Sequence, residues 1–478
     1  MTWNCSFPWS EAPTLAAAAV ALSVATAGAQ QRDPPMYPEM IPPSLPLSKG
    51  TPPPAPGKQG SANVRVLAHL PLGGYFRVSD IDIEQELARP YAYVSRMLHP
   101  TGTDIIDLKQ PTRARVIYSW RIENGELHQG SGAMKPQYFK HRGRYYLVQS
   151  LQFTQDGPDN DVGAVALDVT GLPDTTGIKE VARIRAPDTP GGFHNIFAYK
   201  HSDGRALLFA TTQAQWANMY DLEGVLGGSP DQGLLGRIPN PGAQYLRRGY
   251  HDFYVGYDPA THQDKFYGAG FEGYYVFDVT VPKEPKLLTS VTGAAGIAYA
   301  HTFTPTPDGR YAVAEAEYQF APLRIFDLKP GLDGQVKTIS RPIGAWTADW
   351  QNLPHNHEVR WPYVFVSTYE DGLYVFNMMD PTNPYTVGYY DAYDGPHHKG
   401  YGGSRTPEGT SVSNGTFGLD VRNADGLIVI SDSRFGFWAF HLDGFDGWNG
   451  HSWGMPNVSS AQDWDNGPDG APKPRKAA

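Results

Sequence analysis

The sequence predicts an all-β protein, a seven-bladed β-propeller. The composition is rich in turn residues and aromatics, with 52 Gly, 42 Pro and 13% aromatic residues. A short phrase recurs seven times along the chain, and each repeat has room for four short strands. Self-similarity at a fixed period with four strands per repeat is typical of propeller blades.

The recurring phrase is an aliphatic or aromatic run that closes an extended segment on a polar residue. Its copies are 105–108 (IIDL), 166–169 (ALDV), 219–222 (MYDL), 276–279 (VFDV), 325–328 (IFDL), 375–378 (VFNM) and 439–442 (AFHL). The first strands of the repeats align at Ser79, Gln137, His194, His251, His301, His357 and Phe417. A second strand, a hairpin, the closing run, a turn and a fourth strand follow in each repeat, as expected for a blade.

The seventh repeat has no fourth strand of its own. Residues 63–70 (NVRVLAHL) precede the first opening strand and have the pattern of fourth strands such as 286–291. We therefore expect this N-terminal strand to complete the last blade and close the ring, which removes an open sheet edge.

The ends of the chain differ in composition from the repeats. Residues 1–29 predict an export signal, with an apolar run and an Ala27-Gly28-Ala29 cleavage site, although residues 1–14 contain Glu11 and no Lys or Arg. Residues 30–61 are Pro-rich and predict a disordered leader, 62–458 the propeller, and 459–478 a loose polar tail. We expect a periplasmic or secreted protein without a stable membrane span.

Charge and cysteine content restrict the function. The net charge of -10 and the absence of a basic stripe argue against a nucleic-acid partner. The single cysteine, Cys5, falls in the predicted signal, so the mature chain has no thiolate ligand, disulfide or Cys nucleophile. The sequence also lacks Walker A and H-E-x-x-H motifs. The expected partner is a small-molecule substrate or, on the alternative interpretation below, a protein or a glycan.

Histidine occupies the opening position in four consecutive repeats. The first residues of the innermost strands lie at one mouth of the central channel, so these imidazoles should face a common axis. Neutral imidazole commonly binds Zn, Cu and Fe. We therefore predict a divalent transition-metal site, with Fe(II) favoured and Cu or Zn as alternatives, whose ligands are His194, His251, His301 and His357.

Two other interpretations of these histidines stay open. In the first interpretation, each His only makes a structural hydrogen bond within its own blade, although the repeats that open with Ser79, Gln137 and Phe417 show that a blade forms without this His. His355 shares a strand face with His357, and the chosen register makes His357 the ligand and places His355 in the entering loop.

Acidic residues and one long loop lie near the same mouth. The carboxylates that follow the second strands are expected to orient the imidazoles, or else to be solvated hairpin residues; they are Glu272, Glu315, Glu317 and Glu370. The long connection 391–416 is either a lid over the site or an ordinary exposed loop. Its lid residues would be His397, His398, Lys399 and Tyr401.

Two resemblances extend these expectations. Residues 273–291 (GYYVFDVTVPKEPKLLTSV) and 372–395 (GLYVFNMMDPTNPYTVGYYDAYDG) resemble the LVIVD-repeat propeller family, which implies a fold but no reaction. Four histidines from separate blades, with 192–195 (GFHN) and 250–253 (YHDF), are similar to the iron site of the carotenoid-cleaving oxygenases. That similarity implies a metal-dependent oxidoreductase or oxygenase. The alternative is a non-catalytic exported propeller that binds a protein or a glycan.

Overall fold

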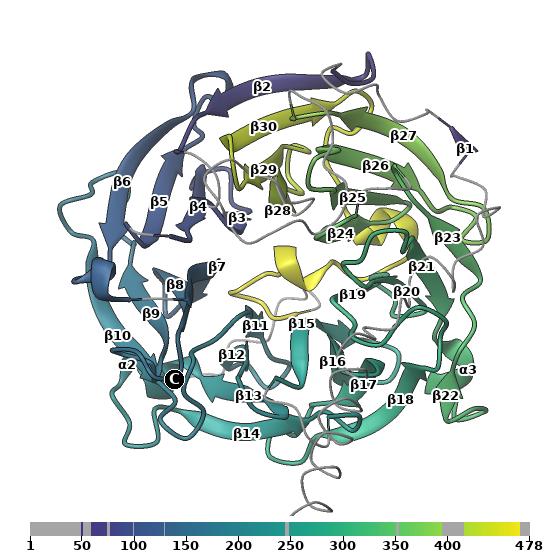
Figure 1. The fold of residues 1–478 in the computed structure, drawn as a ribbon, viewed down its shortest axis with the longest axis horizontal. Coiled ribbons are helices and arrows are strands. Elements are labelled where there is room, and N and C mark those ends of the chain that lie inside the picture. The colour runs from purple at the N-terminus through teal and green to yellow at the C-terminus, as the bar shows by residue number, and fades with distance from the viewer. Residues whose placement is uncertain are drawn as a thin grey trace, which may run out of the picture. The chain divides into compact units, whose positions relative to one another are not determined.

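The computed structural model describes residues 49–50, 59–73, 77–98, 100–128, 130–243, 248–349, 353–393 and 415–468. Within these residues the chain forms seven sheets, each built on four antiparallel strands, arranged as blades in a ring (Figure 1). The predicted seven-bladed β-propeller is therefore confirmed.

Each blade runs outward from the central axis in strand order. Blades 1 to 3 are β3 (Ile81–Ile83), β4 (Tyr91–Arg96), β5 (Gly102–Asp107) and β6 (Arg115–Arg121); β7 (Gly130–His141), β8 (Arg144–Phe153), β9 (Val162–Asp168) and β10 (Lys179–Arg185); and β11 (Ile196–Lys200), β12 (Ala206–Thr211), β13 (Trp216–Asp221) and β14 (Leu234–Pro239). Blades 4 and 5 are β15 (Tyr250–Asp258), β16 (Gln263–Gly270), β17 (Gly273–Asp278) and β18 (Lys286–Thr292); and β19 (Thr302–Pro305), β20 (Tyr311–Glu315), β21 (Leu323–Asp327) and β23 (Gly344–Trp346). Blades 6 and 7 are β24 (His357–Arg360), β25 (Tyr363–Ser367), β26 (Leu373–Asn377) and β27 (Tyr385–Tyr390); and β28 (Thr416–Val421), β29 (Ile428–Asp432), β30 (Gly436–Leu442) and β2 (Val64–Leu70).

Short elements decorate the outside of the ring and the loops. Two-residue strands extend blades 6 and 4 with parallel pairing; they are β1 (Lys49–Gly50) and β22 (Thr338–Ile339). The helices are α2 (Leu222–Leu226), α3 (Lys329–Leu332), η1 (Pro111–Arg113), η2 (Gly125–Leu127), η3 (Gly450–Trp453) and η4 (Ser459–Ala461). Among the described residues, none of the helices has the length and apolar character needed to span a bilayer.

The N-terminal strand closes the ring as predicted. β2 is antiparallel to β30, with Val64 opposite Leu442 and Leu70 opposite Phe437. Figure 1 shows the purple strand β2 beside the yellow strand β30. Because β2 supplies the outer strand of blade 7, the edge of β30 is paired rather than open.

The core lies between the faces of neighbouring blades. Middle strands are covered on both faces, and β9 is buried along its whole length. Aromatic rings fill the space between adjacent blades; the rings of Phe209 in β12 and Phe266 in β16 stack with centroids 6.1 Å apart. Burying such a side chain contributes about 1.5–3 kcal/mol, so the ring is held together mainly by this packing.

The C-terminal segment crosses the ring in Figure 1 (yellow), and it contacts the first strands of blades 3 and 4 beyond their opening residues. The main-chain N–H of Ser459 donates to the Tyr254 hydroxyl at 2.7 Å, and the Ser459 hydroxyl donates to the Val255 carbonyl. The Gln462 side chain pairs with β11, donating to the Ala198 carbonyl at 3.0 Å and accepting from the Lys200 N–H. Serine and glutamine thus supply hydrogen bonds that a further strand would have made.

This packing corrects the expected loose tail for residues 459–468, where Ser459, Gln462 and Trp464 are buried. The predicted signal at 1–29, residues 30–48 and 51–58 of the leader, the lid residues His397, His398, Lys399 and Tyr401, and residues 469–478 lie outside the described residues.

Candidate metal centre

Four imidazoles from four consecutive blades meet at one mouth of the channel. The centroid separations are 4.3 Å between His194 and His251, 4.1 Å between His251 and His301, and 4.7 Å between His301 and His355. Each ring therefore contacts the next around the axis. His251, His301 and His355 are buried, and His194 is half-buried.

The local backbone explains why His194 and His355 are equivalent. The N–H of Asn195 donates to Thr211 Oγ1 at 2.8 Å, and the N–H of Asn356 donates to Ser367 Oγ at 3.1 Å. In both blades the N–H of that Thr or Ser donates back to the Asn carbonyl at 2.9 Å. The same pairing of first and second strands sets the preceding His at the channel mouth.

The structure places His355 beside His301, whereas the sequence register favoured His357. His357 lies in β24 opposite Val366, and its Nε2 is 3.2 Å from the carbonyl oxygen of Val313 in β20. Its ring is thus buried against the neighbouring blade instead of facing the other imidazoles. The signal that the sequence reading missed is the short polar residue after each converging His, namely Asn195, Asp252, Thr302 and Asn356; His357 is followed by Glu358.

Oxygen acceptors fix the Nδ1 side of three of these imidazoles. His194 Nδ1 lies 2.7 Å from Gln152 Oε1, and His301 Nδ1 lies 2.5 Å from Glu315 Oε2. His355 Nδ1 lies 2.7 Å from the carbonyl oxygen of Phe417. An oxygen acceptor requires a proton on Nδ1, which leaves the Nε2 lone pair of a neutral ring available. Histidines that ligate metals are held in this way.

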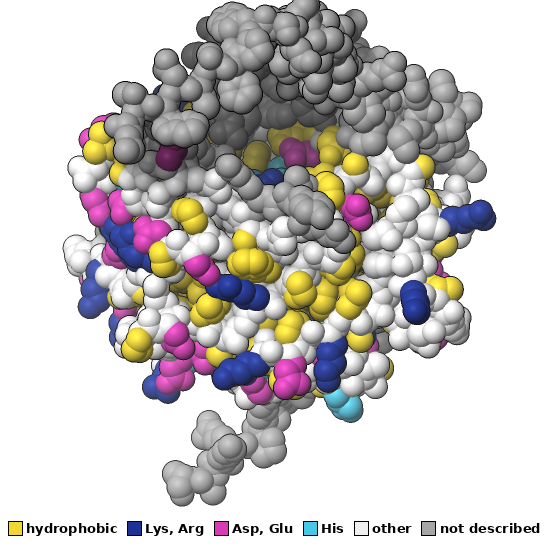
Figure 2. Space-filling model, turned by 60° about the horizontal axis from the view of Figure 1, so that its bottom comes forward, with side chains coloured by type: hydrophobic (Ala, Val, Ile, Leu, Met, Phe, Trp, Pro, Cys, Tyr) yellow, Lys and Arg dark blue, Asp and Glu magenta, His cyan; other side chains and the backbone are white. Residues whose placement is uncertain are grey.

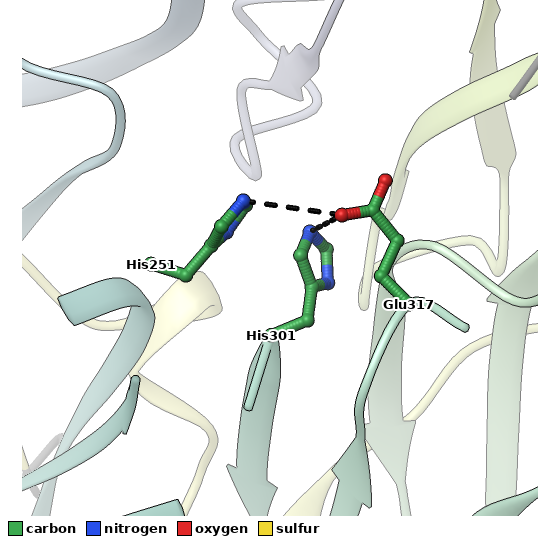
Figure 3. Close-up of side chains that lie close together, drawn as sticks. All are labelled: His251, His301 and Glu317. Carbon is green, nitrogen blue, oxygen red and sulfur yellow. Dashed lines mark ion pairs between the residues drawn. The ribbon is translucent and has the colours of Figure 1, made fainter. Parts of the chain in front are cut away.

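The Nε2 atoms of His251 and His301 converge with the carboxylate of Glu317 (Figure 3). Glu317 Oε2 lies 3.4 Å from His301 Nε2 and 3.9 Å from His251 Nε2. One ligand atom from each of His251, His301 and Glu317 lies within 4.8 Å of the other two. Ligand bonds of about 2.0–2.2 Å place two ligands of one metal ion roughly 3–4 Å apart, and both nitrogen–oxygen distances to Glu317 fall in that range.

The pKa of His301 differs from the pKa of its two neighbours, His251 and His355. Burial opposes protonation of His301, but Glu315 and Glu317 outweigh it and raise the pKa of His301 to about 9. Burial raises the pKa of Glu315 to about 7 against the opposing effect of His301. Burial and the neighbouring His301 hold the pKa of His251 and of His355 well below the usual range. His251 and His355 are therefore in the neutral form that binds metals, and His301 would release its additional proton on binding an ion.

The other two predicted carboxylates lie elsewhere at this mouth. Glu272 is beside Tyr275 of its own blade, where burial and that carboxylate raise the pKa of Tyr275 to about 12. Glu370 is fully buried, and together with burial it raises the pKa of Tyr393. The structure therefore brings Glu315 and Glu317 to the imidazoles and places Glu272 and Glu370 beside tyrosines.

A small cavity of about 10 Å³, with room for about one water molecule, adjoins the histidines. Its lining includes His194, His251, His301 and His355, together with Asp80, Met134, Lys135, Asn195, Asp252, Asn356 and Phe417. Lys135 Nζ lies 3.4 Å from Asp80 Oδ2, and Asp80 and Asp252 raise the pKa of Lys135 against the effect of burial. Figure 2 shows a hollow in the surface in which histidine, acidic and basic side chains come into view together.

Sequence reasoning missed Lys135, Asp80 and Asp252. Asp80 and Asp252 directly follow the opening residues Ser79 and His251, so their place in the repeat was a signal that they line the same mouth of the channel. Lys135 gave none, because a register shift between Ala133 and Pro136 in β7 displaces it from the repeat pattern.

Comparisons with known proteins add no identity to this geometry. No protein-family model matches the chain. No curated protein matches it at a significant level.

Proposed function

We propose that the protein is a metal-dependent oxidoreductase or oxygenase acting on a small substrate, with Fe(II) as the favoured metal. The observation that supports this most is the convergence of one ring nitrogen each of His251 and His301 with a Glu317 oxygen, all within 4.8 Å of one another. Two histidines and one carboxylate on one face of an ion, with open positions, are typical of non-haem Fe(II) oxygenases. Cu and Zn are the alternative metals for the same donors.

His194 and His355 extend this donor set on either side. Both contact a ring of the central pair, at 4.3 Å and 4.7 Å. With them the site holds four imidazoles from separate blades, which is the arrangement that resembles the carotenoid-cleaving oxygenases. The exchange of His357 for His355 preserves the number of imidazoles in the predicted set.

The residues around the donors have separable roles in this proposal. The bound metal would supply a site where O₂ or a substrate oxygen is polarised. Gln152, Glu315 and the Phe417 carbonyl hold three rings in the tautomer that presents Nε2. The adjoining cavity has room beside the donors for a molecule about the size of water, with Lys135 as a hydrogen-bond donor and Asn356 as both donor and acceptor.

We also propose that the chain is exported through residues 1–29 to the periplasm or the medium. The support is the apolar run and cleavage pattern of the sequence. N-terminal sequencing of the protein recovered from an extracytoplasmic fraction tests it, and a retained Met1 would refute it.

The metal proposal is tested by the metal content of the purified protein after reconstitution with Fe(II). The wild-type protein should bind one ion per chain, and His251→Ala should lose it. His357→Ala is the matched control, because this histidine is equally buried in a neighbouring blade but points to the Val313 carbonyl. The control should keep its metal.

Two outcomes would overturn the proposal. One is a wild-type protein that binds no Fe(II), Cu(II) or Zn(II) and shows no change in thermal stability with them. The other is a His251→Ala variant that retains the ion. In either case a partner-binding propeller becomes the better reading, and capture of protein or glycan ligands is the next experiment.

A further inference from the structure

Tyr369 links the carboxylate of the candidate metal centre to a different blade. It follows β25 of blade 6, and its hydroxyl donates to Glu317 Oε1 at 2.6 Å. The other oxygen of Glu317, Oε2, faces His251 and His301. The two carboxylate oxygens therefore have different partners, one a phenol and the other the imidazole pair.

The backbone of Tyr369 is held in an uncommon conformation. Its φ is +41°, in the left-handed region that a bulky aromatic residue seldom adopts. Two main-chain hydrogen bonds join Tyr369 to blade 7: the N–H groups of Tyr369 and Thr416 donate to each other's carbonyl oxygens at 3.1 Å and 3.0 Å. Gly415 is required for this contact: a Cβ there would lie 2.5 Å from the Tyr369 carbonyl oxygen.

Glu317 is in the same uncommon conformation, with φ of +49°. Both ends of the hydrogen bond thus sit on left-handed residues in the hairpins of adjacent blades. Each such residue costs roughly 1–3 kcal/mol and persists only where its surroundings determine it, commonly at functional sites. The two left-handed conformations bring the Tyr369 hydroxyl into contact with the Glu317 carboxylate.

The ring of Tyr369 also contacts the imidazole row. It lies 4.9 Å from the ring of His355, at an angle of 62°. Tyr369 is 2% exposed, so it is fixed between the carboxylate, His355 and blade 7 and has no freedom to turn away.

We propose that Tyr369 is a positioning residue that restricts Glu317 to one metal-facing oxygen. With Oε1 engaged by the phenol, only Oε2 is offered to the ion, and a coordination position stays open for a reactant. This inference rests on the proposed metal-binding function and deepens it. It adds a group that acts through Glu317.

The test compares Tyr369→Phe with Tyr374→Phe. Tyr374 is an equally buried tyrosine in β26 of the same blade, and its hydroxyl makes no hydrogen bond among the described residues. Co(II) serves as the probe, because its visible absorption weakens as coordination number rises. Binding affinity and the Co(II) spectrum are measured for both variants and for the wild type.

We expect Tyr369→Phe to bind Co(II) at least tenfold more weakly, the lower end of the loss seen when such a supporting hydrogen bond is removed. Its spectrum should weaken as the freed oxygen also reaches the ion. Tyr374→Phe should match the wild type in both. A Tyr369→Phe protein with wild-type affinity and spectrum would overturn the inference.

A double-mutant cycle separates positioning from general stability. On a Glu317→Gln background, Tyr369→Phe should cause no further loss of Co(II) affinity, because the charged acceptor is already gone. An undiminished loss there would show that Tyr369 acts through the fold and would refute the inference. A wild-type protein that binds no Co(II), Fe(II), Cu(II) or Zn(II) would instead refute the proposed function on which it rests.

Discussion

Asp432 gives a prediction of pH-dependent stability that can be worked from the structure. The residue ends β29 and is fully buried. Its Oδ1 accepts the N–H groups of Arg434 and Phe435, each at 2.8 Å, while Oδ2 has no hydrogen-bond partner among the described residues. Burial therefore raises the pKa of Asp432 from 3.8 to about 7.

The sign follows from comparing the folded and unfolded states. Below about pH 4 both are protonated, and the group has no effect on stability. Between pH 4 and 7 the unfolded chain is ionised while the folded chain keeps its proton, so stability falls as the pH rises. Above pH 7 the loss reaches its full value, about 4 kcal/mol for a shift of roughly three pH units.

The Asp432→Asn substitution removes this titration while keeping the Oδ1 acceptor. The destabilisation of the wild type by Asp432 is partial at pH 5 and complete at pH 8. The unfolding free energy of the variant minus that of the wild type should therefore be about 3 kcal/mol larger at pH 8 than at pH 5. Urea unfolding with a chelator present measures it. Asp446→Asn is the control, since that side chain is 87% exposed. A variant-minus-wild-type difference that stays constant with pH would refute the reasoning.

Two further predictions concern the ends of the propeller. A chain beginning at Gly60 keeps β2, whereas one beginning at Pro71 lacks it, exposes the edge of β30 and should elute as a larger species on size-exclusion chromatography; equal elution and equal thermal midpoints would contradict this. Gln462→Ala leaves the Lys200 N–H and the Ala198 carbonyl without the Gln462 side chain, at a cost of about 1–3 kcal/mol. The Lys200 amide should then exchange hydrogen at least tenfold faster, with amides of β16 as the internal control; an unchanged rate would show that the segment does not depend on Gln462.

The fold was predictable because a ring of blades repeats one solution to strand packing seven times. The closing runs such as 276–279 mark the third strand of each blade, where alternating side chains pack between neighbours. Ring closure was predictable for a related reason, since a missing strand at one end matched a spare strand at the other.

The sequence located the fourth histidine of the site only to within two residues. His355 and His357 are two residues apart and would share a face of an extended strand, so the sequence pattern fits both frames. Only the hydrogen bonds of Asn356 to Ser367 show which frame the backbone adopts. Lys135 was out of reach for a different reason, because the irregularity in β7 breaks the repeat before the strand begins its regular pairing. Tyr369 required the three-dimensional contact between two hairpins that lie 52 residues apart in the sequence.

The pairing of β2 with β30 has a consequence for how the chain is made. His69 in β2 and its partner Phe435 are 366 residues apart, so the first of the 28 blade strands to be synthesised is the last to find its place. At typical synthesis rates of 5–20 residues per second, β2 waits roughly 20–70 s before blade 7 exists. During that time both ends of the growing ring are unpaired edges, and late contacts of such long range slow folding. A translating ribosome should therefore carry a nearly complete but open ring, which is the stage at which a chaperone would protect this protein best.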